Sequence, residues 1–512
     1  MDCSSRAKNK GGSLVVTSTK KDISQPGATQ LEVIDFKKPI RINATERAAG
    51  FDMHDNKFYQ KRVHFIGIGG SGMCGLAQML THMGAVVSGS DRAESPATQK
   101  LEKMGVAISY QQTVASFPPD AQYVVHSAAV KADHPELSQA RHVGVKIFKY
   151  AQMLGEIMRL KHGIAIAGTH GKSTTTSMVA YILLRAGIDP SYIIGASSRQ
   201  LGGSAHGGAG DYFIAEACEF DRSFLNLHPR LAAVTNVEPD HLDYYHDIHE
   251  ITAAFGQFMS QVDPDGVVVT NADNPWCQQA ATQAHARVET YGLTGTPTWL
   301  ATDIQSENGR LSYDVSYMGR RVGRLALRVP GRHNIGNSLI AAALARHCHV
   351  PWDVIASAIE SFTGADRRSE LLGQAGGITI LDDYAHHPTE IRTTLAGLRE
   401  FYRPQRLICV FQPHQHSRTR SLLEEFSLGF SDADMVIIPD IYMARDTEAD
   451  IKAVSSQNLV DRIVANGRYG RYIPTFPEVV SALELELKAG DLVVSMGAGP
   501  VWEITHELVR RL

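Results

Sequence analysis

Apolar and polar positions alternate in two different ways along this chain. From about residue 59 onward, short apolar runs such as Val63–Ile66 and Leu231–Val234 are separated by stretches in which apolar residues recur every three to four positions. Short apolar runs predict buried strands, and the longer repeat predicts helices that cover them. Regular alternation of the two predicts an α/β fold built on mostly parallel sheets.

One construction, an apolar strand followed by a glycine-rich loop and a helix, occurs three times. The loops begin at Gly67, Gly168 and Gly497. Such loops are typical of nucleotide-binding sheets, and a chain of 512 residues suggests about three domains, so we predict three in succession. They are a Rossmann-like domain over residues 59–159, a central sheet with a P-loop-type turn over 160–367 and a Rossmann-like domain over 368–512.

Two segments depart from this alternation. Polar alternation over residues 296–330 predicts a small antiparallel insertion in the central sheet. Residues 1–58 are poor in apolar residues and show no period, so we predict a largely disordered extension. A short buried strand near Leu31–Ile42 is the alternative for part of it.

The bulk composition narrows the class of protein. The net charge is −4 and the isoelectric point about 6.6, so no basic surface predicts nucleic-acid binding. No apolar run approaches the roughly 18 residues that span a bilayer, and we therefore predict no membrane association. The six cysteines are scattered without CxxC or metal-ligand spacing, which favours reduced thiols in the cytoplasm.

The loop from Gly168 to Ser173 carries the strongest chemical signal. It follows an apolar strand and precedes an apolar helical stretch, and Lys172 is the only lysine between His162 and Ile451. Backbone N–H groups of such a turn face an anion, while Lys172 adds a positive charge and Ser173 a hydroxyl for Mg²⁺. The glycine spacing differs from the standard Walker loop, and a chance Gly-Lys-Ser turn is the alternative. We interpret the loop as an ATP site.

The first glycine loop has the pattern Gly67-x-Gly69-x-x-Gly72, with Asp91 at the end of the next strand. This pattern predicts a pyrophosphate at the helix N-terminus and a ribose on the acidic residue. A dinucleotide and a UDP-sugar both carry these groups, so both ligands stay open. A tight turn without a ligand is the third interpretation.

Polar residues also collect at the ends of other predicted elements. Glu216 ends a strand near the phosphate loop, where Mg²⁺ needs a hard oxygen ligand, and His241 follows another strand and could bind a second metal. Asn334 and Asn337 share a helix face and could bind a base or a ribose. The alternatives are a solvated acidic loop for Glu216, a packed histidine for His241 and a helix cap for Asn334.

Two polar segments follow strands of the third predicted domain. Asp382–Glu390 clusters Asp and His residues that could bind a metal, a nucleotide or an amine, or could form a solvated loop. Gln412–Arg420 contains Arg418, whose guanidinium suits a two-point grip on a carboxylate. An exposed arginine without a ligand is the alternative there.

Taken together, these segments resemble the Mur ligases of peptidoglycan synthesis, and in particular their alanine-adding branch. The resemblance implies a UDP-sugar domain, a central ATPase domain and a C-terminal domain that brings the amino acid. It implies that the lactyl carboxylate of UDP-N-acetylmuramate attacks the γ-phosphate of ATP, and that the amine of L-alanine then attacks the acyl phosphate. The expected assembly is a monomer or a homodimer. The segments that carry the resemblance are Gly67–Met73, Gly168–Thr175, Asn236–Tyr245, His333–Asn337, Asp382–Glu390 and Phe411–Arg420, within about Lys61–Leu512.

The resemblance also implies roles for individual residues. Lys172, Glu216 and His241 would be catalytic, and Mg²⁺ (or Mn²⁺) would bind through Ser173, Glu216 and His241. L-alanine would meet His387 and Arg418. The UDP-sugar would contact Gly69, Gly70, Gly72, Met73, Asp91 and Ser127. ATP would contact Gly168, Thr169, His170, Gly171, Lys172, Ser173, Thr174, His333, Asn334, Asn337, Arg368, Asp383 and His386.

Three segments depart from the family's pattern. Gln415 stands where the family has an arginine that would help hold the alanine carboxylate. Tyr150 and Gln152 replace the Arg and Glu of an Arg-Ala-Glu-Met-Leu segment, and Cys218 and Phe220 replace the first Asp and the Ser of an Asp-Glu-Ser-Asp segment. The resemblance therefore fixes the UDP contacts and the choice of amino acid less firmly than the ATP chemistry.

Several sibling Mur ligases hold their second metal with a carbamylated lysine, whereas this chain has no lysine from Ser173 to Ile451. This favours the alanine-adding branch, and a general preference for arginine is the alternative explanation. Three rival functions remain at this stage. They are a Mur-type ligase that adds another amino acid or peptide, an NAD-dependent oxidoreductase suggested by the Gly67 loop, and a non-catalytic nucleotide-binding scaffold.

Overall fold

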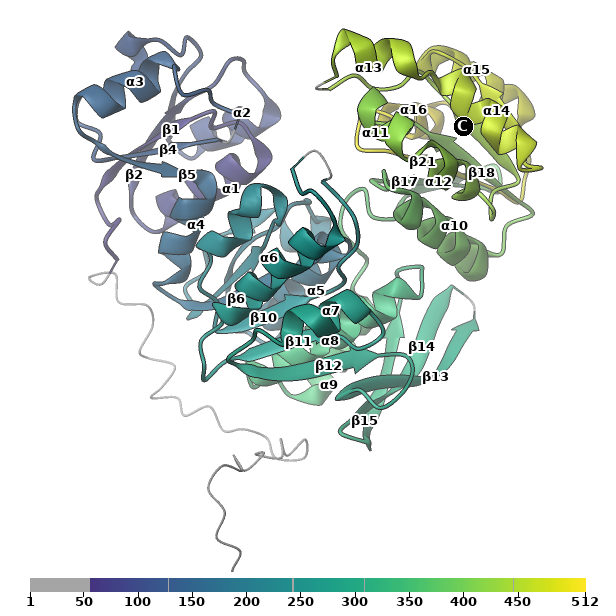
Figure 1. The fold of residues 1–512 in the computed structure, drawn as a ribbon, viewed down its shortest axis with the longest axis horizontal. Coiled ribbons are helices and arrows are strands. Elements are labelled where there is room, and N and C mark those ends of the chain that lie inside the picture. Colours follow the sequence, from purple (N-terminus) through teal and green to yellow (C-terminus); the bar gives the residue numbers. More distant parts are fainter. Residues whose placement is uncertain (1–55, 128, 242–243, 308, 445) are drawn as a thin grey trace, which may run out of the picture. The chain divides into compact units, whose positions relative to one another are not determined.

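Three β-sheets follow one another along the chain in the computed structural model, which confirms the predicted α/β class (Figure 1). The structure describes residues 56–512 except 128, 242–243, 308 and 445. Most of the predicted extension, including the alternative strand near Leu31–Ile42, lies outside the described residues. Residues 56–58 are described, and among them Phe58 is fully buried, with its ring edge-on to that of Tyr123 at 5.6 Å.

The first sheet has five parallel strands in the order β3-β2-β1-β4-β5. The chain leaves β1 towards β2 and β3 on one side and returns to β4 and β5 on the other, so the ligand crevice of such a sheet is expected at the carboxyl end of β1. Gly67 begins the turn there with a φ of +79°, which glycine adopts without strain. The strands are β1 (Arg62–Ile66), β2 (Val86–Ser90), β3 (Ala107–Ser109), β4 (Tyr123–His126) and β5 (Lys146–Lys149). The helices are α1 (Ser71–His82), α2 (Pro96–Lys103), α3 (Pro135–His142) and α4 (Tyr150–Met158).

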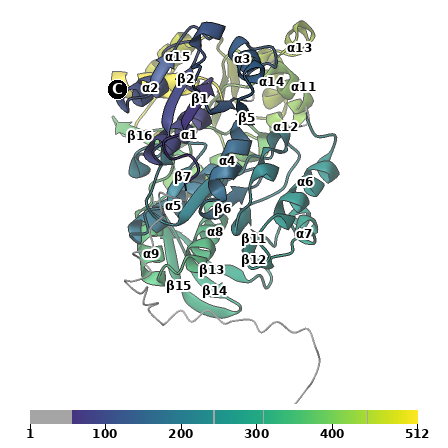
Figure 2. The same cartoon turned by 90° about the vertical axis from the view of Figure 1, so that its left-hand side faces the viewer.

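The middle sheet has ten strands in the order β15-β14-β13-β12-β11-β10-β6-β9-β7-β8. Its central strands are parallel, and helices α5, α8 and α9 lie on one side of it while α6 and α7 lie on the other (Figure 2). The strands are β6 (His162–Ala167), β7 (Ser191–Ile193), β8 (Ala205–His206), β9 (Tyr212–Glu216), β10 (Leu231–Val234), β11 (Val267–Asn271), β12 (Arg287–Gly292), β13 (Trp299–Glu307), β14 (Arg310–Tyr317) and β15 (Arg320–Leu327). The helices are α5 (Lys172–Arg185), α6 (Ile248–Ser260), α7 (Pro275–Ala281), α8 (His333–His347) and α9 (Trp352–Ser361).

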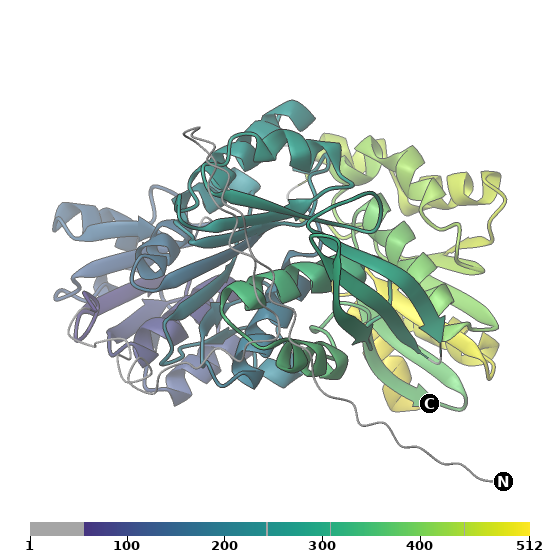
Figure 3. The ribbon, with the colours of Figure 1, turned by 90° about the horizontal axis from the view of Figure 1, so that it is seen from below.

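Strands β13, β14 and β15 confirm the predicted antiparallel insertion. Each pairs antiparallel with the next, and they extend the middle sheet at one edge, as the teal strands of Figure 3 show. Buried and more exposed residues alternate along β14, from Leu311 to Tyr317. This period-two pattern is the one that a strand with one buried face requires.

The third sheet has six strands in the order β16-β17-β21-β18-β19-β20, with only its first pair antiparallel. Strand β18 is almost wholly apolar because both of its faces are covered. Leu407, Cys409 and Phe411 pack against residues of α10, α12 and α14, whereas Ile408 and Val410 pack against residues of α15 and α16. The strands are β16 (Glu370–Ala375), β17 (Ile378–Asp383), β18 (Arg406–Phe411), β19 (Met435–Ile438), β20 (Gly470–Tyr472) and β21 (Asp491–Met496). The helices are α10 (Pro388–Tyr402), α11 (His416–Ser421), α12 (Leu423–Leu428), α13 (Glu448–Ala453), α14 (Ser456–Ala465), α15 (Phe476–Glu486) and α16 (Trp502–Arg511).

Neighbouring parallel strands place their loops side by side. In the middle sheet β6 lies between β9 and β10, so the loops after these three strands meet at one edge. The candidate phosphate loop follows β6, Glu216 ends β9, and Thr235 follows β10. Among the described residues, no helix is long and apolar enough to cross a membrane.

Replacing Phe58 by alanine tests whether residues before 59 belong to the folded region. Removing a fully buried phenylalanine costs about 3–5 kcal/mol, so we expect faster amide hydrogen exchange in β1 and β4 of Phe58→Ala. Tyr59→Ala is the matched control, because Tyr59 is 37% exposed and should cost less. Equal protection of both strands in wild type and Phe58→Ala would contradict the assignment.

Candidate functional site

The phosphate loop, residues 168–171, joins β6 to α5. Gly168 has a φ of +133° and Gly171 a φ of +82°, conformations that favour glycine. A Cβ atom on Gly168 would lie 1.9 Å from Thr235 Oγ1, and one on Gly171 would lie 2.6 Å from Asn337 Oδ1. Helix α5 has no side-chain cap at its N-terminus, so its first N–H groups and its dipole suit an anion.

The residues after β10 hold this loop in shape. Asn236 Oδ1 accepts a hydrogen bond from the N–H of His170 at 2.8 Å, and Asn236 Nδ2 donates to the His170 carbonyl at 3.1 Å. The Thr169 N–H donates to the Asn236 carbonyl at 3.0 Å, and Thr169 Oγ1 accepts from the Glu238 N–H at 2.9 Å. A neighbouring strand end therefore fixes the backbone of the loop.

Lys172 turns back onto the loop and pairs with Glu219. Its Nζ donates to the carbonyl oxygens of Gly168 and Thr169, and lies 3.0 and 2.9 Å from the two carboxylate oxygens of Glu219. The Glu219 side chain is only 3% exposed. Burial alone would lower the pKa of Lys172, but the Glu219 carboxylate more than offsets this and raises the pKa above its ordinary value. The lysine is therefore a partly buried ammonium with a buried carboxylate partner.

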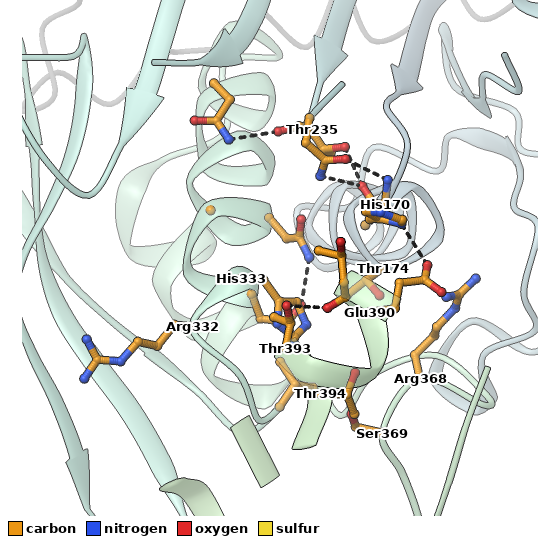
Figure 4. Close-up of a pocket in the computed structure, with 18 of the residues that line it drawn as sticks. His170, Thr174, Thr235, Arg332, His333, Arg368, Ser369, Glu390, Thr393 and Thr394 are labelled. Carbon is orange, nitrogen blue, oxygen red and sulfur yellow. Dashed lines mark hydrogen bonds and ion pairs between the residues drawn. The ribbon is translucent and has the colours of Figure 1, made fainter. Parts of the chain in front are cut away.

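A cavity of about 240 Å³ extends from the phosphate loop to α8 and the first turns of α10 (Figure 4). Asn337 Nδ2 donates to Asn334 Oδ1 at 2.8 Å, and Asn334 Nδ2 donates to the Pro330 carbonyl at 2.7 Å. Asn334 lies inside α8, whose N-cap is Arg332, so the alternative of a helix cap does not hold. The predicted ATP residues that line the cavity are His170, Gly171, Thr174, His333, Asn334, Asn337, Arg368 and Asp383. Those that do not line it are Gly168, Thr169, Lys172, Ser173 and His386.

Two histidines of this cavity differ in charge near pH 7, because His170 is protonated and His333 is neutral. His170 Nδ1 lies 2.9 Å from Glu390 Oε1, a contact drawn in Figure 4, and His170 Nε2 lies 3.5 Å from Glu238 Oε2. Burial alone would lower the pKa of His170, but Glu390 and Glu238 together raise it to about 10. Burial lowers the pKa of His333 to about 4, so His333 is neutral near pH 7. Burial also raises the pKa of Asp383 to about 6.

The predicted metal ligands fall into two groups. Ser173 and Glu216 line one cavity, where Glu216 Oε2 accepts a hydrogen bond from the Gly195 N–H at 2.8 Å. His241 belongs to a second group, since its Nε2 lies 3.7 Å from Glu219 Oε1 and 3.8 Å from Asp240 Oδ2. In this second group one potential ligand atom from each residue lies within 4.8 Å of the others.

The predicted UDP-sugar residues gather around the first glycine loop. The Gly69 N–H donates to Asp91 Oδ2 at 2.6 Å. Tyr150 lies over Gly72, where an added Cβ would be 2.9 Å from its ring, so the residue that departs from the family's pattern covers this loop. Asp91 and Ser127 line one cavity, and Gly70, Gly72, Met73 and Ser127 line another.

The predicted amino-acid residues come from α10 and α11. His387 is the N-cap of α10, and its ring centroid lies 5.3 Å from that of His170. Burial alone would raise the pKa of Asp240, but the charges of His241 and Arg418 lower it below its ordinary value. Gln415 lies directly before α11 with a φ of +72°, and its N–H donates to the Tyr442 carbonyl at 2.9 Å.

Some residues of the site had no place in the sequence-based prediction. Asn271 Nδ2 donates to the Thr235 carbonyl at 3.1 Å, and the Tyr291 hydroxyl donates to the same carbonyl. Asn271 ends β11, so its place at a strand end was a usable signal. Tyr291 lies on β12, and no local pattern distinguishes it from a core tyrosine.

Three sequence profiles match consecutive parts of the chain. They are the Mur ligase family catalytic domain over residues 62–162, the Mur ligase middle domain over 166–345 and the Mur ligase glutamate ligase domain over 367–499. Each covers one of the three sheets, and together they cover most of the described residues.

Individual relatives match this chain over nearly their whole length. A UDP-N-acetylmuramate–L-alanine ligase of Acetivibrio thermocellus is 44% identical over 454 residues, which is 88% of this chain and 95% of that protein. The crystal structure of the UDP-N-acetylmuramate-alanine ligase of Thermotoga maritima has a TM-score of 0.74 at 26% identity, covering 88% of this chain and 98% of that one. A murein peptide ligase of Psychrobacter arcticus has a TM-score of 0.63 at 26% identity with the same coverage.

These comparisons confirm the resemblance that the sequence motifs predicted. The three profiles follow the order of the three sheets, and the relatives extend over 88% of the chain. The chain belongs to the Mur ligase family.

Proposed function

We propose that this protein is an ATP-dependent ligase that joins L-alanine to the lactyl carboxylate of UDP-N-acetylmuramate, a step of peptidoglycan precursor synthesis. The observation that carries this proposal is the glycine loop with its partly buried ammonium, Lys172, at the N-terminus of α5. Full-length relatives whose names state this activity support the choice of substrates. We expect the enzyme to work in the cytoplasm as a monomer or a homodimer.

The first step brings two anions together and therefore depends on positive charge. A lactyl oxygen bonds to the γ-phosphorus of ATP while the bond from that phosphorus to the β–γ bridging oxygen breaks, giving an acyl phosphate and ADP. Lys172 and the N-terminus of α5 would stabilise the charge that collects on the phosphoryl oxygens, as expected for phosphoryl transfer. No protein nucleophile is required.

The cavity beside the loop suits the nucleoside of ATP. The amides of Asn334 and Asn337 have fixed directions, which favours a directional hydrogen bond to a base or a ribose. His333 is neutral near pH 7 because burial lowers its pKa to about 4, so it can accept as well as donate a hydrogen bond. The protonated His170 would add positive charge near the phosphates.

Hard oxygen ligands are present for a divalent cation. Ser173 and Glu216 line one cavity next to the phosphate loop, and Glu219, Asp240 and His241 form the second group. Glu219 Oε2 is buried, and it is already paired with Lys172 Nζ at 2.9 Å. Mg²⁺ or Mn²⁺ bound to these residues would neutralise phosphate charge, the usual contribution of such ions.

The second step needs the amino acid to be held by its carboxylate with its amine free. The amine nitrogen of L-alanine bonds to the acyl carbon, inorganic phosphate leaves, and the amine loses its proton. Arg418 would grip the alanine carboxylate, and His387 would lie beside it. The UDP-sugar would be held separately at the first glycine loop, where Asp91, Ser127 and Met73 line cavities.

The proposal is tested by release of inorganic phosphate from ATP in the presence of UDP-N-acetylmuramate and single amino acids. Phosphate release should require both the UDP-sugar and an acceptor amine, and it should be fastest with L-alanine and slower with glycine, serine or a tripeptide whose first residue is L-alanine. Preference for the tripeptide would favour a peptide-adding ligase. No phosphate release with any acceptor would favour a nucleotide-binding scaffold.

Lys172→Ala should abolish acyl-phosphate formation while UDP-sugar binding stays intact. Loss of a positioned charge in a phosphoryl-transfer site lowers the rate by about 10²–10³-fold or more. The cavities that the predicted UDP-sugar residues line do not include Lys172. Turnover within about twofold of wild type would refute the phosphate role of this lysine.

Gly168→Ala should eliminate nucleotide binding, whereas Gly187→Ala should leave it nearly unchanged. Both glycines have positive φ, +133° and +72°, so a side chain is disfavoured at both by backbone strain. Only Gly168 has a close neighbour, with Thr235 Oγ1 at 1.9 Å from an added Cβ, while nothing lies within 4 Å of one on Gly187. Equal ADP affinities of the two variants in calorimetry would show that the loop does not need this close approach.

Gln415→Arg should lower the KM for L-alanine several-fold. Arginine offers a planar fork to a carboxylate, and the substitution keeps an unbranched side chain at the same backbone position. Gln415→Lys is the control, because it adds the charge without the fork and should have the smaller effect. An unchanged KM in Gln415→Arg would place the alanine carboxylate elsewhere.

A further inference from the structure

Glu219 faces two groups that compete for it. Its Oε1 lies 3.0 Å from Lys172 Nζ and 3.7 Å from His241 Nε2, and its Oε2 lies 2.9 Å from Lys172 Nζ. The side chain is 3% exposed, so both carboxylate oxygens are shielded from water. One buried carboxylate therefore serves the phosphate-loop lysine while lying beside a histidine that can bind a metal.

Hydrogen bonds hold the backbone of Glu219 in place, so a change of partner involves its side chain alone. The Tyr245 hydroxyl donates to the Glu219 carbonyl, and the N–H of Arg222 donates to it at 3.0 Å. On the opposite side, His241 has a φ of +52° and packs its ring against Phe220 at 5.0 Å. The Glu219 backbone and the His241 ring are thus held by contacts that do not involve the Glu219 carboxylate.

A cation bound by Glu219, Asp240 and His241 would place positive charge close to the Lys172 ammonium. Like charges a few ångströms apart in a site of low dielectric repel strongly. The present pairing of Lys172 and the binding of a metal by Glu219 are therefore mutually opposed. Triphosphate oxygens at the loop would relieve the conflict, because they give Lys172 another anionic partner.

We propose that Glu219 is a positioning residue that exchanges partners when nucleotide binds. It holds Lys172 against the loop until phosphate oxygens take over the ammonium, and the released carboxylate then joins Asp240 and His241 in binding a divalent cation. This inference rests on the proposed function and adds the order in which nucleotide and metal bind. Nucleotide binding comes before binding of the metal at His241.

The exchange predicts that Glu219→Gln binds nucleotide more tightly and the metal more weakly than wild type. Without divalent cations, ADP should bind this variant about tenfold more tightly than wild type, because Lys172 is no longer paired with a carboxylate. With a non-hydrolysable triphosphate present, the affinity for Mn²⁺ at the second metal site should fall about tenfold or more. Calorimetry measures the first change, and electron paramagnetic resonance of free Mn²⁺ measures the second.

Lys172→Ala gives the reciprocal test. Here Glu219 loses its ammonium partner, so Mn²⁺ should bind the nucleotide-free variant about tenfold more tightly than it binds nucleotide-free wild type. This measurement does not depend on the folding of Glu219→Gln or on turnover. A metal affinity equal to or below that of wild type would overturn the exchange.

Glu360→Gln is the matched control, since it makes the same change on α9 at a residue whose side chain is 47% exposed. It should leave both affinities unchanged. If Glu219→Gln melts like wild type but binds metal-free ADP no more tightly, the exchange is refuted. Failure of the proposed function would appear differently, as a wild-type protein that releases no phosphate with the UDP-sugar and L-alanine.

Discussion

An ion pair between the partly buried Lys172 ammonium and the buried Glu219 carboxylate lies where the ends of β6 and β9 meet. Nζ is 3.0 and 2.9 Å from the two carboxylate oxygens, and Glu219 is nearly inaccessible to water. A buried lysine without a partner would be expected to lose its proton, whereas this one has a raised pKa. The carbonyl oxygens of Gly168 and Thr169 and the Glu219 carboxylate hold that charge at the start of α5.

The fold makes this possible through the geometry of parallel strands. Three neighbouring strands, β9, β6 and β10, end at the same edge, and each contributes a different chemical group. β9 supplies Glu216, β6 the glycine loop, and β10 the Thr235–Asn236 segment that holds the loop by hydrogen bonds. In open α/β sheets, ligands generally bind outside the carboxyl ends of the parallel strands.

Local patterns predicted much of this architecture because they report local physics. The strand–glycine–helix segments, the antiparallel strands between Trp299 and Leu327 and the buried strand Arg406–Phe411 all follow from periodicity and turn residues. Pairings between distant segments did not follow. Glu219 stands 47 positions from Lys172, and no sequence pattern distinguishes its carboxylate from that of Glu216. The burial of Phe58 has no local signal either, because a single apolar residue in a polar stretch gives no period.

The central claim is that the ammonium of Lys172 serves the phosphates of a bound nucleotide. A crystal structure with Mg²⁺ and a non-hydrolysable ATP analogue tests it most directly. The account predicts Lys172 Nζ within hydrogen-bond distance of β- and γ-phosphate oxygens and separated from Glu219, with the triphosphate over Gly168–Ser173. A triphosphate bound elsewhere, with Lys172 still paired to Glu219, would contradict it.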